Sequence, residues 1–206
     1  MPTPDQILQG LAAIANGRMI LAVFWHLILA VVIIAALAGW RPIKRSGATA
    51  LAVPLFSVSL LAWLYGNPFN GTVFLLFGAA LAAVGMRRPA SRVEPPPAWA
   101  LVIGPALVIF GWAYPHFLVG GSRLRYLYEA PTGLIPCPTL SVLVGLTLLA
   151  AGFSSRTFSL CLGILGVFYG LFGAFRLGVR IDLVLLAGAI GLVALALTSK
   201  PKATRG

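Results

Sequence analysis

Charged residues are scarce in this 206-residue sequence, at 9% of the chain, and only 4 of them are Asp or Glu. Soluble domains carry roughly 25% charged residues, because water must wet most of their surface. Hydrophobic residues make up 60% of the chain, and the mean hydropathy is +0.98. This composition excludes a soluble globular domain, and it also excludes a disordered or collagen-like chain. It predicts a polytopic membrane protein.

Cysteine and histidine are also rare, with two residues of each in the chain. Two cysteines are too few for a disulfide scaffold, and Cys137 and Cys161 do not form a CxxC pair. The spans predicted below separate the two thiols by most of the bilayer, which excludes a disulfide between them. The chain contains no GxxxxGK[ST] phosphate loop, no HExxH metal motif and no nucleophile elbow. These absences favour a protein without catalytic activity over an enzyme.

Long apolar runs are what the sequence does contain. Seven of them approach the ~20 residues that cross the core of a bilayer. They indicate an all-α bundle of seven transmembrane helices, which forms one integral membrane domain over residues 1–206. The predicted spans are residues 19–39, 49–66, 71–86, 98–114, 139–153, 157–175 and 182–198.

The segment before the first span, residues 3–15, predicts a short helix that lies in the membrane surface. It opens with Thr-Pro-Asp, which is typical of a helix cap followed by proline in the first turn. Ile7, Leu11 and Ile14 then recur at helical spacing. A signal peptide is not favoured, because no basic region precedes the apolar residues.

The net charge of +11 can indicate a nucleic-acid-binding protein. Here, however, the basic residues fall in short clusters between the apolar runs. In that position they set the topology and contact anionic lipid headgroups. We therefore expect the lipid bilayer, and no nucleic acid, to be the partner of these charges.

The distribution of Lys and Arg also predicts an orientation. Connections on one side of the predicted membrane carry ten basic residues and those on the other side carry five, and the richer side is cytoplasmic by the positive-inside rule. The sequence thus predicts a protein of the bacterial inner (plasma) membrane with its N-terminus outside and its C-terminus in the cytoplasm. The ten are Arg41, Lys44, Arg45, Arg87, Arg88, Arg92, Arg156, Lys200, Lys202 and Arg205, and the five are Arg18, Arg123, Arg125, Arg176 and Arg180.

The longest connection, residues 115–138, is predicted to lie outside and to form an ordered cap. The shorter cytoplasmic connections carry charge and no reactive cluster, so they are expected to be plain links. The outer loop contains four prolines, which restrict its backbone. We expect Arg123 or Arg125 to pair with Glu129, and we expect the apolar side chains to pack over the helix ends. These apolar residues are Phe117, Leu118, Leu124, Tyr126, Leu127 and Tyr128.

The candidate ligand-binding residues fall in the outer half of the predicted bundle. His26 is well inside a span, and ionisable groups at that depth usually face the protein interior or a wet cavity. Cys137 stands between two prolines, with Thr139 placed to cap the helix that follows, and a helix N-terminus favours a thiolate. Its alternative role is that of a small residue in a rigid start to that helix. The full set is His26, Tyr65, His116, Arg123, Arg125, Glu129 and Cys137.

Three of these residues are also candidate metal ligands. Imidazole and thiolate groups bind soft metals and haem, so His26, His116 and Cys137 form the possible set. Their spacing matches no known ligand motif, and no cofactor is assigned. Outward arginines outnumber the two acids Glu129 and Asp182, which indicates a rim that attracts an anion or a lipid headgroup.

Small residues recur at every fourth position in and after the sixth span, at Gly166, Gly170, Ala174 and Gly178. Small side chains at this spacing let two helix backbones approach closely. We expect a helix-packing face, either within the bundle or towards another membrane subunit or a second copy of the chain.

Three short motifs surround the outer loop: Tyr-Pro-His at residues 114–116, Ala-Pro-Thr-Gly at 130–133 and Pro-Cys-Pro-Thr at 136–139. On these motifs, and on Leu-Thr-Leu-Leu at 146–149, the chain resembles an uncharacterised family of bacterial multi-pass membrane proteins of unknown function. The resemblance implies that the motifs mark the end of one span, the outer loop and the start of the next span. It implies no activity, and the Gly-Gly-Ser-Arg stretch at 120–123 departs from the family's loop.

Three functions remain open. A small-solute permease would use an outward-facing polar site between His26, Tyr65, Glu129 and Cys137, with residues 115–138 as its cap. A non-catalytic accessory or anchoring subunit of a membrane complex would use the small residues and the outer loop as contact surfaces. A metal- or haem-binding membrane protein would need the histidines and Cys137 to converge. We place the permease first.

Overall fold

The computed structural model describes residues 3–198, and every regular element within that range is a helix. The predicted all-α fold class is therefore confirmed. The α-helices are α1 (Pro4–Gly17), α2 (Met19–Leu37), α3 (Lys44–Ala50), α4 (Val53–Leu64), α5 (Pro68–Met86), α6 (Ala100–Trp112), α7 (Pro136–Leu149), α8 (Arg156–Leu171) and α9 (Leu183–Thr198). Shorter 3-10 or π segments are η1 (Arg123–Leu127), η2 (Ala151–Ser154), η3 (Phe172–Arg176) and η4 (Arg180–Asp182).

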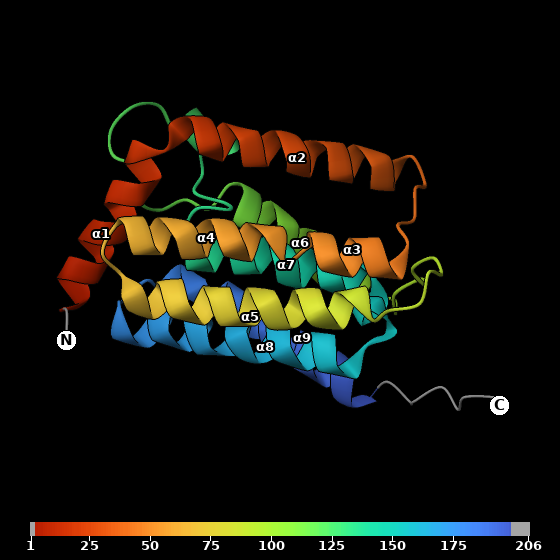
Figure 1. The fold of residues 1–206 in the computed structure, drawn as a ribbon. Coiled ribbons are helices and arrows are strands. Elements are labelled where there is room, and N and C mark those ends of the chain that lie inside the picture. The colour runs from red at the N-terminus through yellow and green to blue at the C-terminus, as the bar shows by residue number, and fades with distance from the viewer. Residues whose placement is uncertain (1–2, 199–206) are drawn as a thin grey trace.

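Helices α2 to α9 run side by side, and α1 crosses them at one end of the bundle (Figure 1). We call this the α1 end and the opposite end, where α3 begins, the far end. The helix predicted before the first span is present as α1. Thr3 caps it, because its hydroxyl accepts a hydrogen bond from the Gln6 backbone N–H at 3.3 Å while the Gln6 side chain accepts one from the Thr3 N–H.

Five helical stretches are long and apolar enough to cross a membrane, and they indicate an integral membrane protein. They are Met19–Leu37, Lys44–Leu64, Pro68–Met86, Arg156–Arg176 and Arg180–Thr198. The two remaining predicted spans, α6 and α7, are present as apolar helices of 13 and 14 residues. These lengths fall below the ~17 residues that a spanning helix needs by itself.

Several predicted boundaries are wrong: the third span begins at Pro68 rather than at residue 71, and α7 ends at Leu149 rather than at residue 153. Two further boundaries are wrong for local reasons. The second span begins at Lys44 rather than at residue 49, because α3 starts directly after the extended residue Ile43. Helix α7 begins at Pro136 rather than at residue 139, and its N-cap is Ile135. Thr139 is therefore not the cap, and its hydroxyl instead donates to the Ile135 carbonyl at 2.6 Å.

Helix α7 is the centre of the bundle. Nearly all of its residues are buried, and it packs against α6, α8 and α9. Its closest approach is to α6, where a Cβ added to Gly145 would lie 2.6 Å from the Gly104 carbonyl oxygen. The small residues at this contact let the backbones of the two short helices pack closely in the core.

The small residues predicted as a packing face join α8 to α9 within the same chain. A Cβ on Gly166 would lie 2.8 Å from the Ala189 side chain, and one on Gly170 would lie 2.9 Å from the Leu186 backbone. Ala174 is buried in η3. Gly178 does not belong to this face, because the helix has already ended and the residue takes a left-handed turn (φ +73°) in open space.

The connections at the far end are more than plain links. Buried Lys44 forms an ion pair with Glu94 at 3.1 Å, and its backbone N–H donates to the Ser91 carbonyl at 2.8 Å. A second contact crosses to the next connection, where the Arg88 guanidinium donates to the Ser154 carbonyl at 2.8 Å. The sequence did not predict these contacts, because they join residues far apart in the chain. Three of the predicted cytoplasmic charges, Lys200, Lys202 and Arg205, lie outside the described residues.

Candidate functional site

A non-helical segment, residues 129–135, is buried throughout its length at the α1 end. Its centre is Gly133, which has a φ of +78° and lies so close to Trp25 that an added Cβ would overlap the indole ring. The Gly133 carbonyl accepts a hydrogen bond from Ser57 at 2.6 Å, and its N–H donates to the Thr139 hydroxyl at 2.8 Å. The segment is thus held by α4 and α7 and lies against α2.

Neighbouring side chains add two further hydrogen bonds around the segment. The Trp25 indole N–H donates to the Ser57 hydroxyl at 3.1 Å, and Thr132 donates to the Gly111 carbonyl of α6. Irregular backbone in a membrane protein must find such partners inside the protein, because lipid offers none. The bonds explain how residues 129–135 can lie buried without being helical.

His26 follows Trp25 on α2 and faces the protein, as expected for an intramembrane histidine. It is 4% exposed, and its Nδ1 and Nε2 atoms lie 2.8 and 2.9 Å from the carbonyl oxygens of Ala22 and Trp112. Its ring also meets the Trp112 ring edge to face, with 4.9 Å between centroids. The histidine joins α2 to α6, because each of its ring nitrogens lies within hydrogen-bond distance of a backbone carbonyl oxygen of one of these helices.

Polar side chains also meet in the core at the α1 end, and we call this set the polar cluster: Tyr114, Cys137, Asp182, Tyr169 and Asn70. The Tyr114 hydroxyl donates to Asp182 Oδ1 at 2.7 Å, and the Tyr169 hydroxyl donates to Asn70 Oδ1 at 2.8 Å. The Cys137 thiol connects the two pairs, because it lies 4.0 Å from the Tyr169 carbonyl oxygen and close enough to Asp182 to act as a hydrogen-bond donor. Asn70, Tyr114, Tyr169 and Asp182 are each at most 7% exposed.

Asp182 is a buried acid that the sequence prediction placed wrongly. Its place at the start of the last span indicated a rim acid, but the carboxyl group is 1% exposed. The chain turns back at Gly178 between η3 and η4, which carries Asp182 inward against Gly173. A Cβ on Gly173 would overlap the carboxylate, so this glycine is the one available signal in the sequence for the buried acid.

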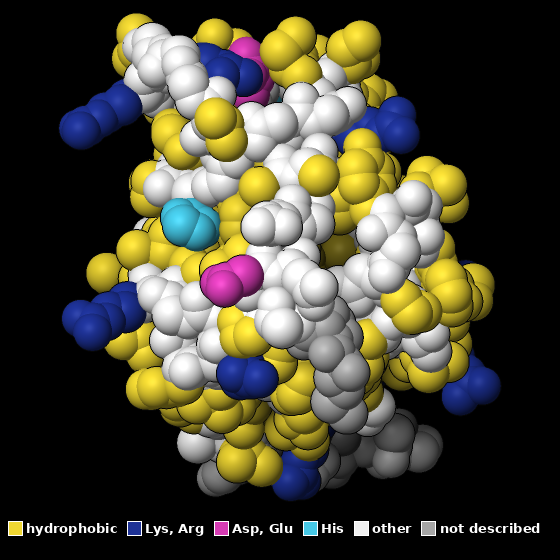
Figure 2. Space-filling model, turned by 90° about the vertical axis from the view of Figure 1, so that its left-hand side faces the viewer, with side chains coloured by type: hydrophobic (Ala, Val, Ile, Leu, Met, Phe, Trp, Pro, Cys, Tyr) yellow, Lys and Arg dark blue, Asp and Glu magenta, His cyan; other side chains and the backbone are white. Residues whose placement is uncertain are grey.

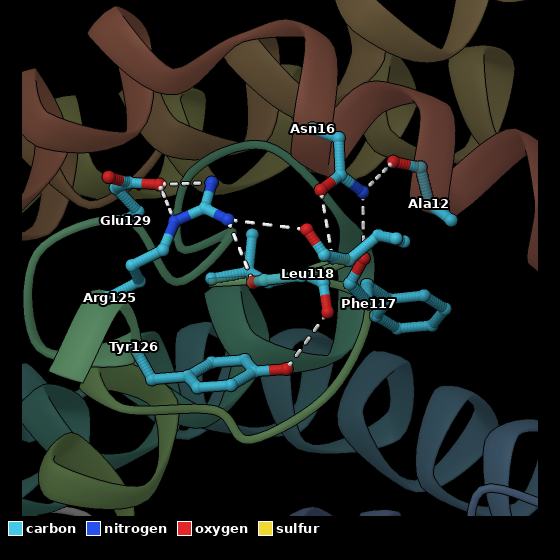
Figure 3. A network of polar contacts seen from close by, with 9 residues as sticks. Ala12, Asn16, Phe117, Leu118, Arg125, Tyr126 and Glu129 are labelled. Carbon is cyan, nitrogen blue, oxygen red and sulfur yellow. Dashed lines mark hydrogen bonds and ion pairs between the residues drawn. The ribbon is translucent and has the colours of Figure 1, made fainter. Parts of the chain in front are cut away.

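A cap closes the α1 end, and Figure 3 shows the side chains that hold it. Arg125 forms the expected ion pair with Glu129 at 2.6 Å, and this hydrogen-bonded contact raises the pKa of the guanidinium. Arg125 also donates to the carbonyls of Val119 and Gly120 at 3.3 and 3.0 Å. From α1, Asn16 donates to the Phe117 carbonyl at 2.8 Å and accepts from the Val119 N–H at 3.0 Å.

The prediction that the apolar side chains of this loop pack inward is only partly right. Phe117 packs against a buried cluster that includes Leu11, Ile14 and Leu134. Leu124, Leu127 and Tyr128 are exposed instead. The physical reason is the short 3-10 segment η1, which has three residues per turn and therefore presents Leu124 and Leu127 on the same outer face.

Two shallow depressions of about 640 and 420 Å³ lie in the surface of this cap. Arg123 is exposed in the first, and half-buried His116 lines the second. Burial lowers the pKa of His116. Figure 2 looks onto the α1 end and shows basic side chains spread over it rather than gathered in one patch. Neither depression is lined by Cys137 or Asp182.

The predicted site residues therefore separate into different places. His26 and Glu129 are buried, Arg123, Arg125 and His116 belong to the cap, and Cys137 belongs to the polar cluster. Tyr65 is half-buried at the end of α4, where its ring lies 5.6 Å from the Arg18 guanidinium. Among residues 3–198, no three His, Cys, Asp or Glu side chains lie close enough to form a metal site.

No known protein family, no curated protein and no solved structure matches this chain. The resemblance to an uncharacterised family of bacterial membrane proteins therefore stays a prediction.

Proposed function

We propose that this chain crosses the membrane with seven helices and acts as a small-solute permease whose translocation site is the polar cluster. The observation that supports this most is the burial of Asp182 in a chain with an apolar surface. A buried carboxyl group costs free energy that apolar packing would not, so stability alone does not account for it. Ionisable groups inside a membrane bundle usually mark a pathway for a substrate, an ion or a proton.

The backbone around the cluster supports the same function. Helix α7 starts after the buried irregular segment 129–135, and α8 continues into the π segment η3 before the chain reverses at Gly178. Binding sites in transporters are often built where membrane helices are interrupted, because free backbone groups and helix ends can then face the substrate. The polar cluster lies beside the start of α7, at Cys137, and beside the π segment η3, at Gly173.

The irregular segment also supports a crossing by α7. Helix α7 alone has 14 residues, but residues 129–135 extend the buried path before it begins. A buried non-helical segment can continue a crossing where the surrounding protein satisfies its backbone. Helix α6 packs along α7 and would cross with it.

The described conformation is closed under this proposal. The depressions in the cap do not reach the polar cluster, and Asn16 of α1 holds the cap loop in place. With the orientation predicted from the basic residues, the cap faces outside. Solute would then enter from the outside after the contacts between Asn16 and the loop break.

The native thiol Cys137 offers a test of this opening. In a Cys161→Ser background, right-side-out vesicles are treated with a membrane-impermeant thiol reagent, and labelling of Cys137 is followed by mass spectrometry. We expect slow labelling in the wild-type cap. In the Asn16→Ala variant, the loss of two cap contacts of about 0.5–1 kcal/mol each should speed labelling roughly 5- to 30-fold.

The matched control is Gln9→Ala, which changes an exposed side chain on the same helix and none of the described cap contacts. An accessory subunit has no need to open this site. If Cys137 stays unlabelled in both the wild type and Asn16→Ala, while a denaturing detergent exposes it fully, the permease proposal fails.

A further inference from the structure

We infer that Asp182 is a proton-binding site, which holds its proton while the polar cluster is closed and releases it when water enters. This inference deepens the proposed function and rests on it for its biological role. A group that binds and releases a proton at a translocation site can couple solute movement to a proton gradient.

The contacts of Asp182 shield its carboxyl group from bulk water. Oδ1 accepts the Tyr114 hydrogen bond at 2.7 Å, and the backbone at Gly173 closes the space beside the carboxyl group. The side chain is 1% exposed. These contacts can hold a neutral carboxylic acid as well as a carboxylate, since both forms accept a hydrogen bond on Oδ1.

The titratable and charged groups around Asp182 come from the end of α6 and from four further elements, α7, α8, η3 and η4. Tyr114 follows α6, Cys137 is on α7, and Tyr169 on α8 lies behind Cys137. Arg176 and Arg180, on η3 and η4, are exposed. The ion pairs found within residues 3–198 are Lys44–Glu94 and Arg125–Glu129, so no cation in that range pairs with Asp182.

Desolvation then decides the protonation state. Isolated carboxylates become neutral when buried, because the penalty for removing a charge from water exceeds that for removing a neutral acid. The two neighbouring donors, a phenol and a thiol, are neutral and recover only part of that penalty. When the site opens, water solvates the carboxylate and takes the proton, and the reverse transfer closes the cycle. The step moves one proton between Asp182 and water and involves no oxidation or reduction.

Infrared difference spectroscopy tests the proton directly in the full chain in lipid nanodiscs at about pH 5, where an ordinary exposed Asp side chain is ionised. A protonated carboxylic acid has a carbonyl stretching band that a carboxylate lacks. We expect this band in the wild type, its loss in Asp182→Asn and its retention in the control Asp5→Asn, which alters an exposed acid of α1. Absence of a band that distinguishes the wild type from Asp182→Asn would show an ionised Asp182 and would overturn the inference.

Tyr114→Phe provides a second variant in case Asp182→Asn does not fold. It removes the hydrogen bond to the carboxyl group and keeps the ring, so the wild-type band should move to higher frequency. A band that does not move in Tyr114→Phe belongs to another acid, which would also overturn the inference. A merely structural role for Tyr114 would change stability and leave no such spectral shift.

The spectra do not depend on transport, so the two proposals can fail separately. A protonated Asp182 together with a permanently unlabelled Cys137 would keep the proton site and reject the permease. Labelling of Cys137 together with an ionised Asp182 would keep the opening and reject the proton site.

Discussion

Gly133 is the residue on which the buried segment 129–135 depends most. Replacement by alanine would force an L side chain into a φ of +78° and drive its Cβ into the Trp25 ring. We expect Gly133→Ala to lower the free energy of unfolding by more than the roughly 1–3 kcal/mol of backbone strain alone. Thermal unfolding in detergent measures this, with Gly120→Ala as the control.

Gly120 has a similar φ of +72°, but nothing lies within 4 Å of the position of its Cβ. Gly120→Ala therefore carries the strain without the collision. Equal melting temperatures for the two variants would show that the Trp25 contact does not constrain the segment.

His116 gives the cap a dependence on pH. Its pKa in the folded chain lies below the ordinary value of 6.5, because the half-buried ring loses water. Protonation therefore favours the unfolded cap, so the stabilisation is complete above pH 6.5 and is lost as pH falls from there through the folded pKa.

We predict that the wild type loses thermal stability relative to His116→Gln when pH is lowered from about 8 to about 5. Both proteins share their other titrating groups, so the difference between their melting temperatures isolates His116. Melting temperatures that fall in parallel would contradict the prediction.

The sequence was sufficient to predict a side-chain contact where the two residues are close together in the chain. Arg125 and Glu129 are four residues apart, and the structure pairs them. Asp182 was not predictable in the same way, because the turn at Gly178 and the approach of Gly173 decide whether it faces water or the core. An acid at the boundary of a span can face either water or the core, and the sequence does not distinguish the two.

At the scale of elements, the cap depends on side chains from α1. Asn16 makes two hydrogen bonds to the loop backbone, at Phe117 and Val119. Asn16→Ala should increase protease cleavage within residues 118–123 several-fold, since losing bonds of about 1 kcal/mol each raises the open population. Cleavage fragments can be measured by mass spectrometry, with Gln9→Ala as the control. Equal cleavage of both variants would mean that α1 does not hold the cap.

The contact between α8 and α9 is a second test at this scale. Gly170→Ala would place a Cβ 2.9 Å from the Leu186 backbone, whereas Gly191→Ala on α9 would place one 3.6 Å from the Trp99 ring. The first distance forces the helices apart and the second is an ordinary contact. We expect Gly170→Ala to lower the melting temperature and Gly191→Ala to leave it nearly unchanged. A similar effect of both would contradict close packing at Gly170.

Helix positions followed from the apolar runs, because lipid imposes a minimum length on them. The sequence placed α2 and α9 within two residues of their observed ends. It could not show that α7 starts at Pro136, because the hydrogen bonds of Thr139 and Gly133 decide that boundary. It also missed the outward face of η1, since the choice of a 3-10 turn depends on the contacts of the whole cap.

At the scale of the whole molecule, α7 is the buried centre and α2 lies at the edge of the bundle, with most of its apolar surface exposed (Figure 1). A bilayer would cover that surface. Helix α2 is the more apolar of the two, yet it is the less buried, because composition cannot separate contact with lipid from contact with protein. The positions of polar residues indicate which face of a helix points into the bundle better than its overall composition does.

The central claim is that the polar cluster lies inside a bundle in which α6 and α7 also cross the membrane. Three exposed serines flank these two helices: Ser91 lies before α6, Ser122 lies between α6 and α7, and Ser154 lies after α7. Each is changed to cysteine, one at a time, in a chain without Cys137 and Cys161. Intact cells are then treated with an impermeant thiol reagent. Labelling of Ser122→Cys alone, with Ser91→Cys and Ser154→Cys reached only after lysis, is the predicted result. Labelling of Ser122→Cys together with either of the other two would contradict the seven-helix crossing.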